Sequence, residues 1–191
     1  MILAAAVVLG LTASLLRHGR RAPARIASAP LRAAWLALLA LAFQLPLLRA
    51  PAGPANGLRL QQVLLLISYL LLLYFIWRNR RLGAIPIVGA GIGCNLLAIL
   101  ANGGFMPITP QTLVTINPGS SVQHWPEGTH YGYSKDIILA RGDTHLWPLS
   151  DVLAIPPPFP WPTAFSAGDL VLAAGIIVLL AAPEWILERR N

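Results

Sequence analysis

The stretch NLLAILANGGFMPITP, residues 95–110, decides the architecture that the rest of the chain follows. It begins as an apolar helix suited to hydrocarbon and ends in two glycines and two prolines. Glycine tolerates positive φ, and proline cannot continue a helix. We therefore expect a helix that stops at Asn102 and turns sharply beneath a segment of different character.

The composition of the whole chain indicates a membrane protein. Its 191 residues are 56% hydrophobic and 11% charged, and its mean hydropathy is +0.65. A soluble domain carries about 25% charged residues. The apolar residues also form long runs, which is typical of a polytopic membrane protein whose apolar surface faces lipid.

Five apolar runs approach the roughly 20 residues that a helix needs to cross a bilayer. They are residues 1–16, 31–48, 58–77, 82–101 and 169–187. The sequence therefore predicts an all-α membrane protein with five transmembrane helices. Its expected parts are a four-helix region over 1–102, a loop over 103–168, and a fifth helix with its tail over 169–191.

Basic residues orient these helices. Two arginines, Arg49 and Arg59, lie in the short loop on one side. Ten flank the ends on the other side: Arg17, Arg20, Arg21, Arg25, Arg32, Arg78, Arg80, Arg81, Arg189 and Arg190. Because arginine is enriched on the cytoplasmic side, we expect a bacterial inner-membrane protein with its N-terminus outside and its C-terminus inside.

The net charge of +7 thus reflects topology and contact with lipid headgroups. No basic face is interleaved with aromatic residues over a polar domain, which argues against a nucleic-acid partner. The lone Cys94 lies in an apolar run, where it is expected to be a small packing residue.

Residues 103–168 are predicted to form an ordered extracytoplasmic cap. Five of the seven acidic residues lie in it or at its edge, together with many aromatic residues. Its proline-rich part, IPPPFPWPTAF at 155–165, is unsuited to a helix. We expect that part to be an extended strap in the membrane interface, with Trp161 and Phe165 at headgroup level.

Two asparagines of the fourth apolar run, Asn95 and Asn102, lie seven residues apart and hence on roughly one helix face. An amide within a membrane needs a hydrogen-bonding partner, and the glutamines at 44, 61 and 62 are the expected partners. One interpretation is that these bonds hold the bundle together; the alternative is a polar pocket open to the outside. The candidate lining residues are Gln44, Asn95, Asn102, Asp151 and Asp169.

Small residues suggest how the helices pack. Gly89 and Gly93 lie four residues apart on the fourth run, with Gly91 between them, and this stripe of small residues lets another helix approach closely. At the other end of the cap, Ser166 and Asp169 precede or begin the last run and are expected to cap its helix.

The segment HWPEGTH, residues 124–130, contains His124, Glu127 and His130, which suit zinc chemically. Their spacing differs from that of HExxH, and Pro126 and Gly128 favour a turn. Solvated loop side chains are the preferred interpretation, so we expect no metal or other cofactor.

Three motifs carry a resemblance to a known family: NGGFMP at 102–107, SDVLAIPPPFP at 150–160 and FSAGD at 165–169. Together they resemble a family of small bacterial multi-span membrane proteins of unknown function. The matching positions are Asn102, Gly103, Gly104, Met106, Pro107, Asp151, Phe165, Ser166, Gly168 and Asp169. The resemblance implies a membrane fold and no established activity.

Function is open among three hypotheses. The first is a non-enzymatic accessory or assembly subunit, in contact with lipid and with other membrane subunits through the fourth helix or the cap. It is favoured because the spans lack deeply placed charges and repeated halves, which many transporters show. The second is small-molecule or lipid binding, or transport, at the polar pocket. The third is a metal-dependent membrane enzyme that uses His124, Glu127 and His130.

Overall fold

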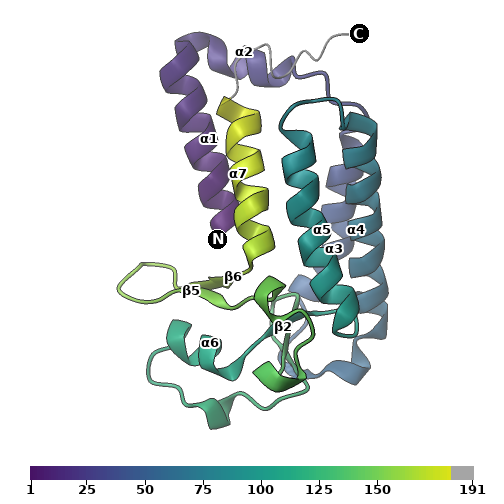
Figure 1. The fold of residues 1–191 in the computed structure, drawn as a ribbon, viewed down its shortest axis with the longest axis vertical. Coiled ribbons are helices and arrows are strands. Elements are labelled where there is room, and N and C mark those ends of the chain that lie inside the picture. Colours follow the sequence, from purple (N-terminus) through teal and green to yellow (C-terminus); the bar gives the residue numbers. More distant parts are fainter. Residues whose placement is uncertain (182–191) are drawn as a thin grey trace.

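The computed structural model describes residues 1–181 and is mostly helical (Figure 1). Five helices run side by side, and each occupies the apolar run that predicted it. They are α1 (Ile2–His18), α3 (Trp35–Leu48), α4 (Arg59–Asn79), α5 (Ile85–Ala101) and α7 (Ala167–Ala181). Helix α7 packs between α1 and α5, and α4 packs between α3 and α5. The expected tail over 182–191 lies outside the described residues.

Two of these helical segments are long and apolar enough to cross a membrane, judged by length and composition. They are Ile2–Ala27, in which the short α2 (Ala22–Ala27) continues from α1, and Arg59–Asn79. The other three helices are apolar and contain 14, 17 and 15 described residues. Large apolar side chains cover the outward faces of the bundle, including the exposed Leu38 and Leu70. Such extended apolar surfaces are typical of contact with lipid or with another protein.

Glycines bring α5 and α7 into close contact. A Cβ atom at Gly91 would lie 2.5 Å from the backbone nitrogen of Leu172, and one at Gly175 would lie 2.7 Å from that of Val88. Real Cβ atoms do not approach other atoms so closely, so the two backbones pack where neither position carries a side chain. Glycine therefore sets the spacing of this helix pair.

The expected glycine stripe is not a single packing surface. A Cβ atom at Gly89 would meet Ile76 of α4 at 2.6 Å, whereas one at Gly93 would have no neighbour within 4 Å. The close contact with α7 is made by Gly91, which lies between them. Gly91 thus makes the expected close approach of another helix, whereas Gly89 and Gly93 do not pack on a common helix within residues 1–181.

The cap contains strands, so the all-α expectation is wrong for this part of the chain. Strands β1 (Gly53–Pro54), β3 (Thr129–Tyr131), β4 (Asp136–Ile138) and β2 (Met106–Ile108) form a sheet in that order. Strands β2 and β4 are parallel, and the other pairs are antiparallel. Since β1 comes from the α3–α4 connection, the cap is not confined to residues 103–168.

Shorter elements complete the cap. Helix α6 (Pro110–Ile116) follows β2, and 3-10 turns connect the remaining parts. These turns are Ala55–Gly57, Val122–His124, Arg141–Asp143 and Trp147–Leu149, and a further one, Gly19–Arg21, joins α1 to α2.

The proline-rich strap is the loop of a β-hairpin. Its two ends pair antiparallel as β5 (Leu153–Ile155) and β6 (Thr163–Phe165). At its tip, Phe159 and Trp161 are exposed and their rings lie edge to face at 6.4 Å. Phe165, expected at headgroup level, is instead buried at the end of β6, just before α7.

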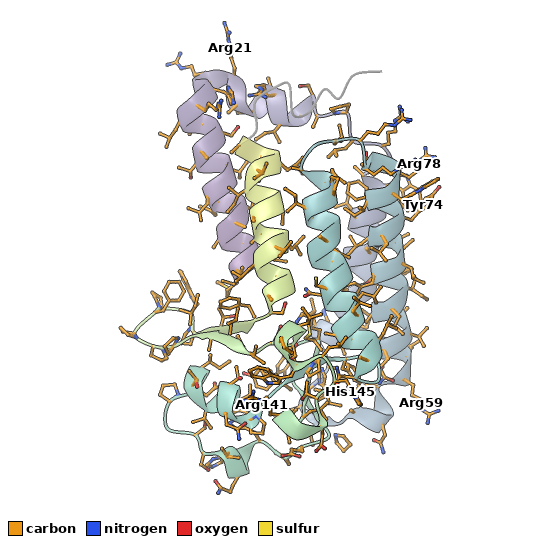
Figure 2. All side chains as sticks on the ribbon, viewed as in Figure 1. Arg21, Arg59, Tyr74, Arg78, Arg141 and His145 are labelled. Carbon is orange, nitrogen blue, oxygen red and sulfur yellow. The ribbon has the colours of Figure 1, made fainter. Side chains whose placement is uncertain are left out.

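The two ends of the bundle differ in composition. Figure 2 shows Arg21 and Arg78 at the end away from the cap, and Arg141 and His145 within the cap. At the end away from the cap, Asn79 connects the end of α4 to the segment before α3. Its side chain accepts from the backbone N–H of Arg32 at 2.7 Å and donates to the carbonyl of Arg32 at 2.8 Å.

Candidate binding pocket beneath the cap

A cavity of about 520 Å³ lies between the cap and the adjacent ends of the helices. The ends of α1, α3 and α4 supply one wall, which is mainly apolar. The cap and the start of α7 supply the opposite wall, where the charged side chains lie. The polar and charged side chains considered below are Gln44, Lys135, Asp136, Asp151 and Asp169. This volume is within the range of small-molecule sites, about 300–1,000 Å³.

Strand β2 places Lys135 and Asp151 beside each other. The carbonyl of Lys135 accepts a hydrogen bond from the N–H of Met106 at 3.0 Å, and the N–H of Asp151 donates to the carbonyl of Pro107 at 3.0 Å. Asp151 also forms an isolated bridge with Ile108. Lys135 and Asp151, which are 16 residues apart in the sequence, are therefore both hydrogen-bonded to β2, and their side chains are in contact.

The Lys135 ammonium is the centre of a compact charge cluster. Its Nζ atom lies 2.7 Å from Oδ2 of Asp151 and 3.3 Å from Oδ1 of Asp136. The Lys135 side chain keeps 26% of its surface exposed, whereas the Asp151 side chain keeps 4%. The cluster thus presents its lysine partly to the cavity and buries its central carboxylate.

Burial and charge act in opposite directions on these groups. Burial raises the pKa of the Asp151 carboxyl from its ordinary 3.8 to about 7, although the Lys135 ammonium lowers it. Burial alone would lower the pKa of Lys135, but the carboxylates of Asp136 and Asp151 outweigh it and hold that pKa well above its usual value. Lys135 therefore stays charged at neutral pH, while Asp151 changes charge near it.

The Asp151 carboxylate is incompletely hydrogen-bonded. Its Oδ1 atom is buried and accepts no hydrogen bond from any residue in the described range 1–181. The indole Nε1 of Trp147 is in the same condition, but Trp147 does not line the cavity. Because buried polar atoms almost always have a partner, the free oxygen of Asp151 distinguishes this wall of the cavity.

A second layer of polar groups supports the cavity behind Asp169. The Nδ2 atom of Asn95 donates to Oδ1 of Asp169 at 2.7 Å, and the hydroxyl of Ser166 donates to Oδ1 of Asn95 at 2.8 Å. Ser166 and Asp169 also bond each other's backbone N–H groups, at 2.9 and 3.2 Å, as a reciprocal cap on α7.

Gly168 makes this second layer possible. A Cβ atom there would lie 2.0 Å from Oδ1 of Asn95. The motif FSAGD therefore requires glycine at position 168 because the Asn95 side chain of α5 occupies the space that a Cβ atom would need. The sequence alone does not reveal this contact.

Asn102 has a different environment from Asn95. Its Nδ2 atom donates to the carbonyls of Ala98 and His145, at 2.7 and 2.8 Å, and its Oδ1 atom accepts from the N–H of His145 at 2.9 Å. Asn102 does not line the cavity. It fastens the end of α5 to the cap, and Gly103 and Gly104, both at positive φ, then turn the chain.

The glutamines do not partner the asparagines, so that expectation is wrong. Gln44 donates to the hydroxyl of Ser68 at 3.0 Å, and Gln62 donates to the carbonyl of Gly103 at 2.9 Å. Of the five expected lining residues, Gln44, Asp151 and Asp169 do line the cavity, while Asn95 lies behind it.

The structure does not bring the three proposed metal ligands together. His124 is exposed and its Nδ1 bonds Ser121 at 2.8 Å, and Glu127 is also exposed. His130 is fully buried, with its ring nitrogens 3.1 and 2.9 Å from the carbonyls of Pro51 and Ser134. Within residues 1–181, no group of three His, Cys, Asp or Glu side chains is arranged to hold a metal ion.

Sequence reasoning missed Lys135, Asp136 and Tyr69. Lys135 is the one lysine among fourteen basic residues, which is the signal that distinguishes it. Tyr69 is buried on α4, within electrostatic range of Lys135 and Asp169. It had no visible signal, because an aromatic residue in an apolar run is ordinarily a packing residue.

These features define a mostly helical protein with candidate membrane-spanning helices and a charged pocket beneath a small cap. The chain belongs to the family of unknown function DUF5317, whose family model matches residues 28–181. This match confirms the membership in a family of unknown function that the sequence motifs predicted. Neither the curated proteins nor the solved structures contain a match.

Proposed function

We propose that this protein spans the bacterial inner membrane five times and binds a small molecule or a lipid in a pocket that faces the outside. The observation that carries this proposal is the cavity of about 520 Å³ in which a buried carboxylate keeps one oxygen without a donor from residues 1–181. The large majority of buried side-chain polar atoms have a hydrogen-bond partner.

Aromatic residues at both ends of the bundle support a membrane-spanning arrangement. Trp35, Tyr74 and Trp77 are exposed near the arginine-rich end, and Phe159 and Trp161 are exposed at the tip of the hairpin beside the cap. Tryptophan and tyrosine concentrate at both interfaces of a bilayer. The three shorter helices require local thinning of the bilayer or anchoring of their flanking side chains, each at modest cost.

The arginines support the orientation with the cap outside. Arg21 and Arg78 lie at the end away from the cap (Figure 2), and Arg80 stacks on the Trp77 ring at 5.0 Å. An arginine above an interfacial tryptophan is suited to lipid phosphates on the cytoplasmic side.

The pocket is better supported than the assembly-subunit hypothesis. One of the two contact surfaces in that hypothesis was the glycine stripe of α5, the other being the cap, but Gly89 and Gly91 are occupied by α4 and α7 of the same chain. Gly93 alone has an open face. A role in assembly through this part of α5 stays a prediction.

Thiol labelling in intact cells tests the proposal. In a Cys94→Ala background, we expect a membrane-impermeant maleimide to label Thr163→Cys, which lines the pocket, without breaking the cells. Ser28→Cys, at the opposite end, serves as the matched control and is expected to react only after lysis. The reverse pattern would overturn the topology, and a Thr163→Cys thiol that reacts only after denaturation would overturn the open pocket.

A further inference from the structure

We infer that the ligand of this pocket carries a protonated amine, which binds the free oxygen of Asp151, attached to an apolar group that lies against the ends of α1 and α3. This inference rests on the proposed function and names the chemical class that the pocket recognises. The ammonium group is common to soluble amines and to the headgroups of aminolipids, and the experiment below separates these two sources.

The charge of the pocket favours a cation. Three carboxylates, those of Asp136, Asp151 and Asp169, line the cavity together with two amino groups, the Lys135 side chain and the amino terminus at Met1. Once Asp151 is ionised, three negative and two positive groups leave an excess of one negative charge in a partly enclosed space. A charge of this kind attracts a positive group and repels an anion.

The free oxygen of Asp151 specifies a hydrogen-bond donor. An ionised carboxylate only accepts hydrogen bonds. Lys135 already bonds Oδ2 at 2.7 Å, while Oδ1 has no donor among residues 1–181. Because Oδ1 is buried, an ammonium in the cavity reaches it when the Asp151 side chain turns toward the cavity, and it then completes the carboxylate with the strong, charge-assisted type of bond. A neutral hydroxyl would supply a donor but would leave the excess charge in place.

The opposite wall specifies an apolar substituent. Ile2 and Leu3 of α1, with Leu47 and Leu48 of α3, also line the cavity. Water gains nothing from contact with such a wall, whereas burial of a hydrocarbon group against it is favourable. An amine with an alkyl chain matches both walls at once, which neither a small inorganic cation nor a polyamine of uniform polarity does.

Thermal unfolding of the full-length protein in detergent tests the amine. The probes are hexylamine, hexan-1-ol and hexanoate, which share one alkyl chain and differ in the polar group. We expect hexylamine to raise the midpoint more than hexan-1-ol does, and hexanoate to have no effect. Asp151→Asn removes the charge with little change of shape and should abolish the preference. The same substitution at the exposed Asp143, which does not line the cavity, should preserve it.

Nanodiscs separate the two sources of the amine. We expect wild-type protein reconstituted in phosphatidylglycerol with phosphatidylethanolamine to retain the latter in native mass spectrometry more than the Asp151→Asn variant does. Retention that depends on Asp151 would identify a lipid amine. Equal retention by both proteins, combined with an Asp151-dependent response to hexylamine, would identify a soluble amine.

The amine inference and the proposed function fail in different ways. If hexan-1-ol or hexanoate acts as strongly as hexylamine, or if Asp151→Asn responds as the wild type does, the amine is wrong and the pocket remains. A second outcome is that the Thr163→Cys thiol is labelled from outside, but none of the probes shifts the midpoint or slows that labelling. The amine inference is then overturned, and the topology stands. An unreachable thiol would overturn the outward-facing pocket itself.

Discussion

Asn102 and Asp151 are both buried where the cap meets the helices, and they differ in how their hydrogen bonds are satisfied. Both the amide nitrogen and the amide oxygen of Asn102 bond backbone groups, at 2.7 to 2.9 Å. Asp151 bonds Lys135 through one oxygen and has no donor from residues 1–181 for the other. The side chain of Asn102 therefore has all its bonds within the fold, whereas Asp151 keeps an acceptor to which a ligand can donate a hydrogen bond.

The far end of the bundle supports this distinction. Asn79 there repeats the arrangement of Asn102: it donates to the carbonyl four residues earlier, that of Phe75, at 2.8 Å. It also pairs with both backbone groups of Arg32. Two asparagines with the same set of bonds at opposite ends indicate a structural device that fastens a connecting segment to a helix end. Asn102 is therefore assigned to the fold, although it had been a candidate lining residue.

The largest effect is expected from crowding the layer behind the pocket. Gly168→Ala places a Cβ atom 2.0 Å from Oδ1 of Asn95, so the start of α7 and the Asn95 side chain must separate. We expect a loss of about 3 kcal/mol in the free energy of unfolding, at the upper end for overpacking. Denaturation of the purified variant in detergent measures it, and an unchanged midpoint would show that the α5–α7 contact is looser than described.

A smaller loss is expected when the cap is unfastened. Asn102→Ala removes three hydrogen bonds to the backbone, and we expect a loss of about 2 kcal/mol. Hydrogen exchange should increase around His145 in the cap and stay unchanged around Arg32. Asn79→Ala is the matched control, with the opposite pattern. If either variant loosened both ends equally, the two asparagines would not be local fasteners.

Asp151 should instead control how stability depends on pH. Its pKa rises from 3.8 to about 7 on folding, so the folded state holds the proton more tightly than the unfolded state. Stability from this group is then present at low pH and is lost as the pH rises from about 4 to about 7. We expect Asp151→Asn to reduce the fall in the free energy of unfolding between pH 5 and pH 8 by about 2–3 kcal/mol, because each pH unit between pH 5 and the raised pKa is worth about 1.4 kcal/mol. The thermal midpoint of the variant should fall correspondingly less over the same range. Asp143→Asn should keep the wild-type fall, and an identical fall in all three proteins would contradict the account.

The smallest effect is expected at the open glycine of α5. Gly93→Ala meets no atom within 4 Å, and alanine is favoured over glycine within a helix by about 0.5–1 kcal/mol. The variant should be as stable as the wild type or slightly more stable in detergent. A clear loss would indicate that a second protein chain packs on Gly93, which a change in oligomeric state by light scattering would reveal.

The helices were predictable from the sequence because the distribution of apolar residues records them locally. The end of α5 was predictable for the same reason, since Asn102 and the glycines after it act on their own segment. The strands were not, because β1 is two residues long and pairs with β3 from a segment about 75 positions later, Gly53 with His130. Nothing local in GP or THY marks that pairing.

The pocket was predictable in part. Asp151 and Asp169 could be named because they are acidic residues beside apolar runs, and Gln44 because it interrupts one. Lys135 could not be placed, since its position depends on a parallel pairing of β2 with β4 that brings it to Asp151. The two asparagines of α5 could not be told apart, because their roles depend on which segments the fold lays against them.

The most direct test of the central claim is carbodiimide labelling of Asp151, since dicyclohexylcarbodiimide is apolar and reacts with protonated carboxyl groups. Peptide mass spectrometry should find Asp151 modified at pH 6 and much less at pH 8, with the exposed Asp143 little modified at either pH. An unreactive Asp151 at both pH values, or one that reacts no better than Asp143, would contradict a buried carboxylate that faces an open pocket.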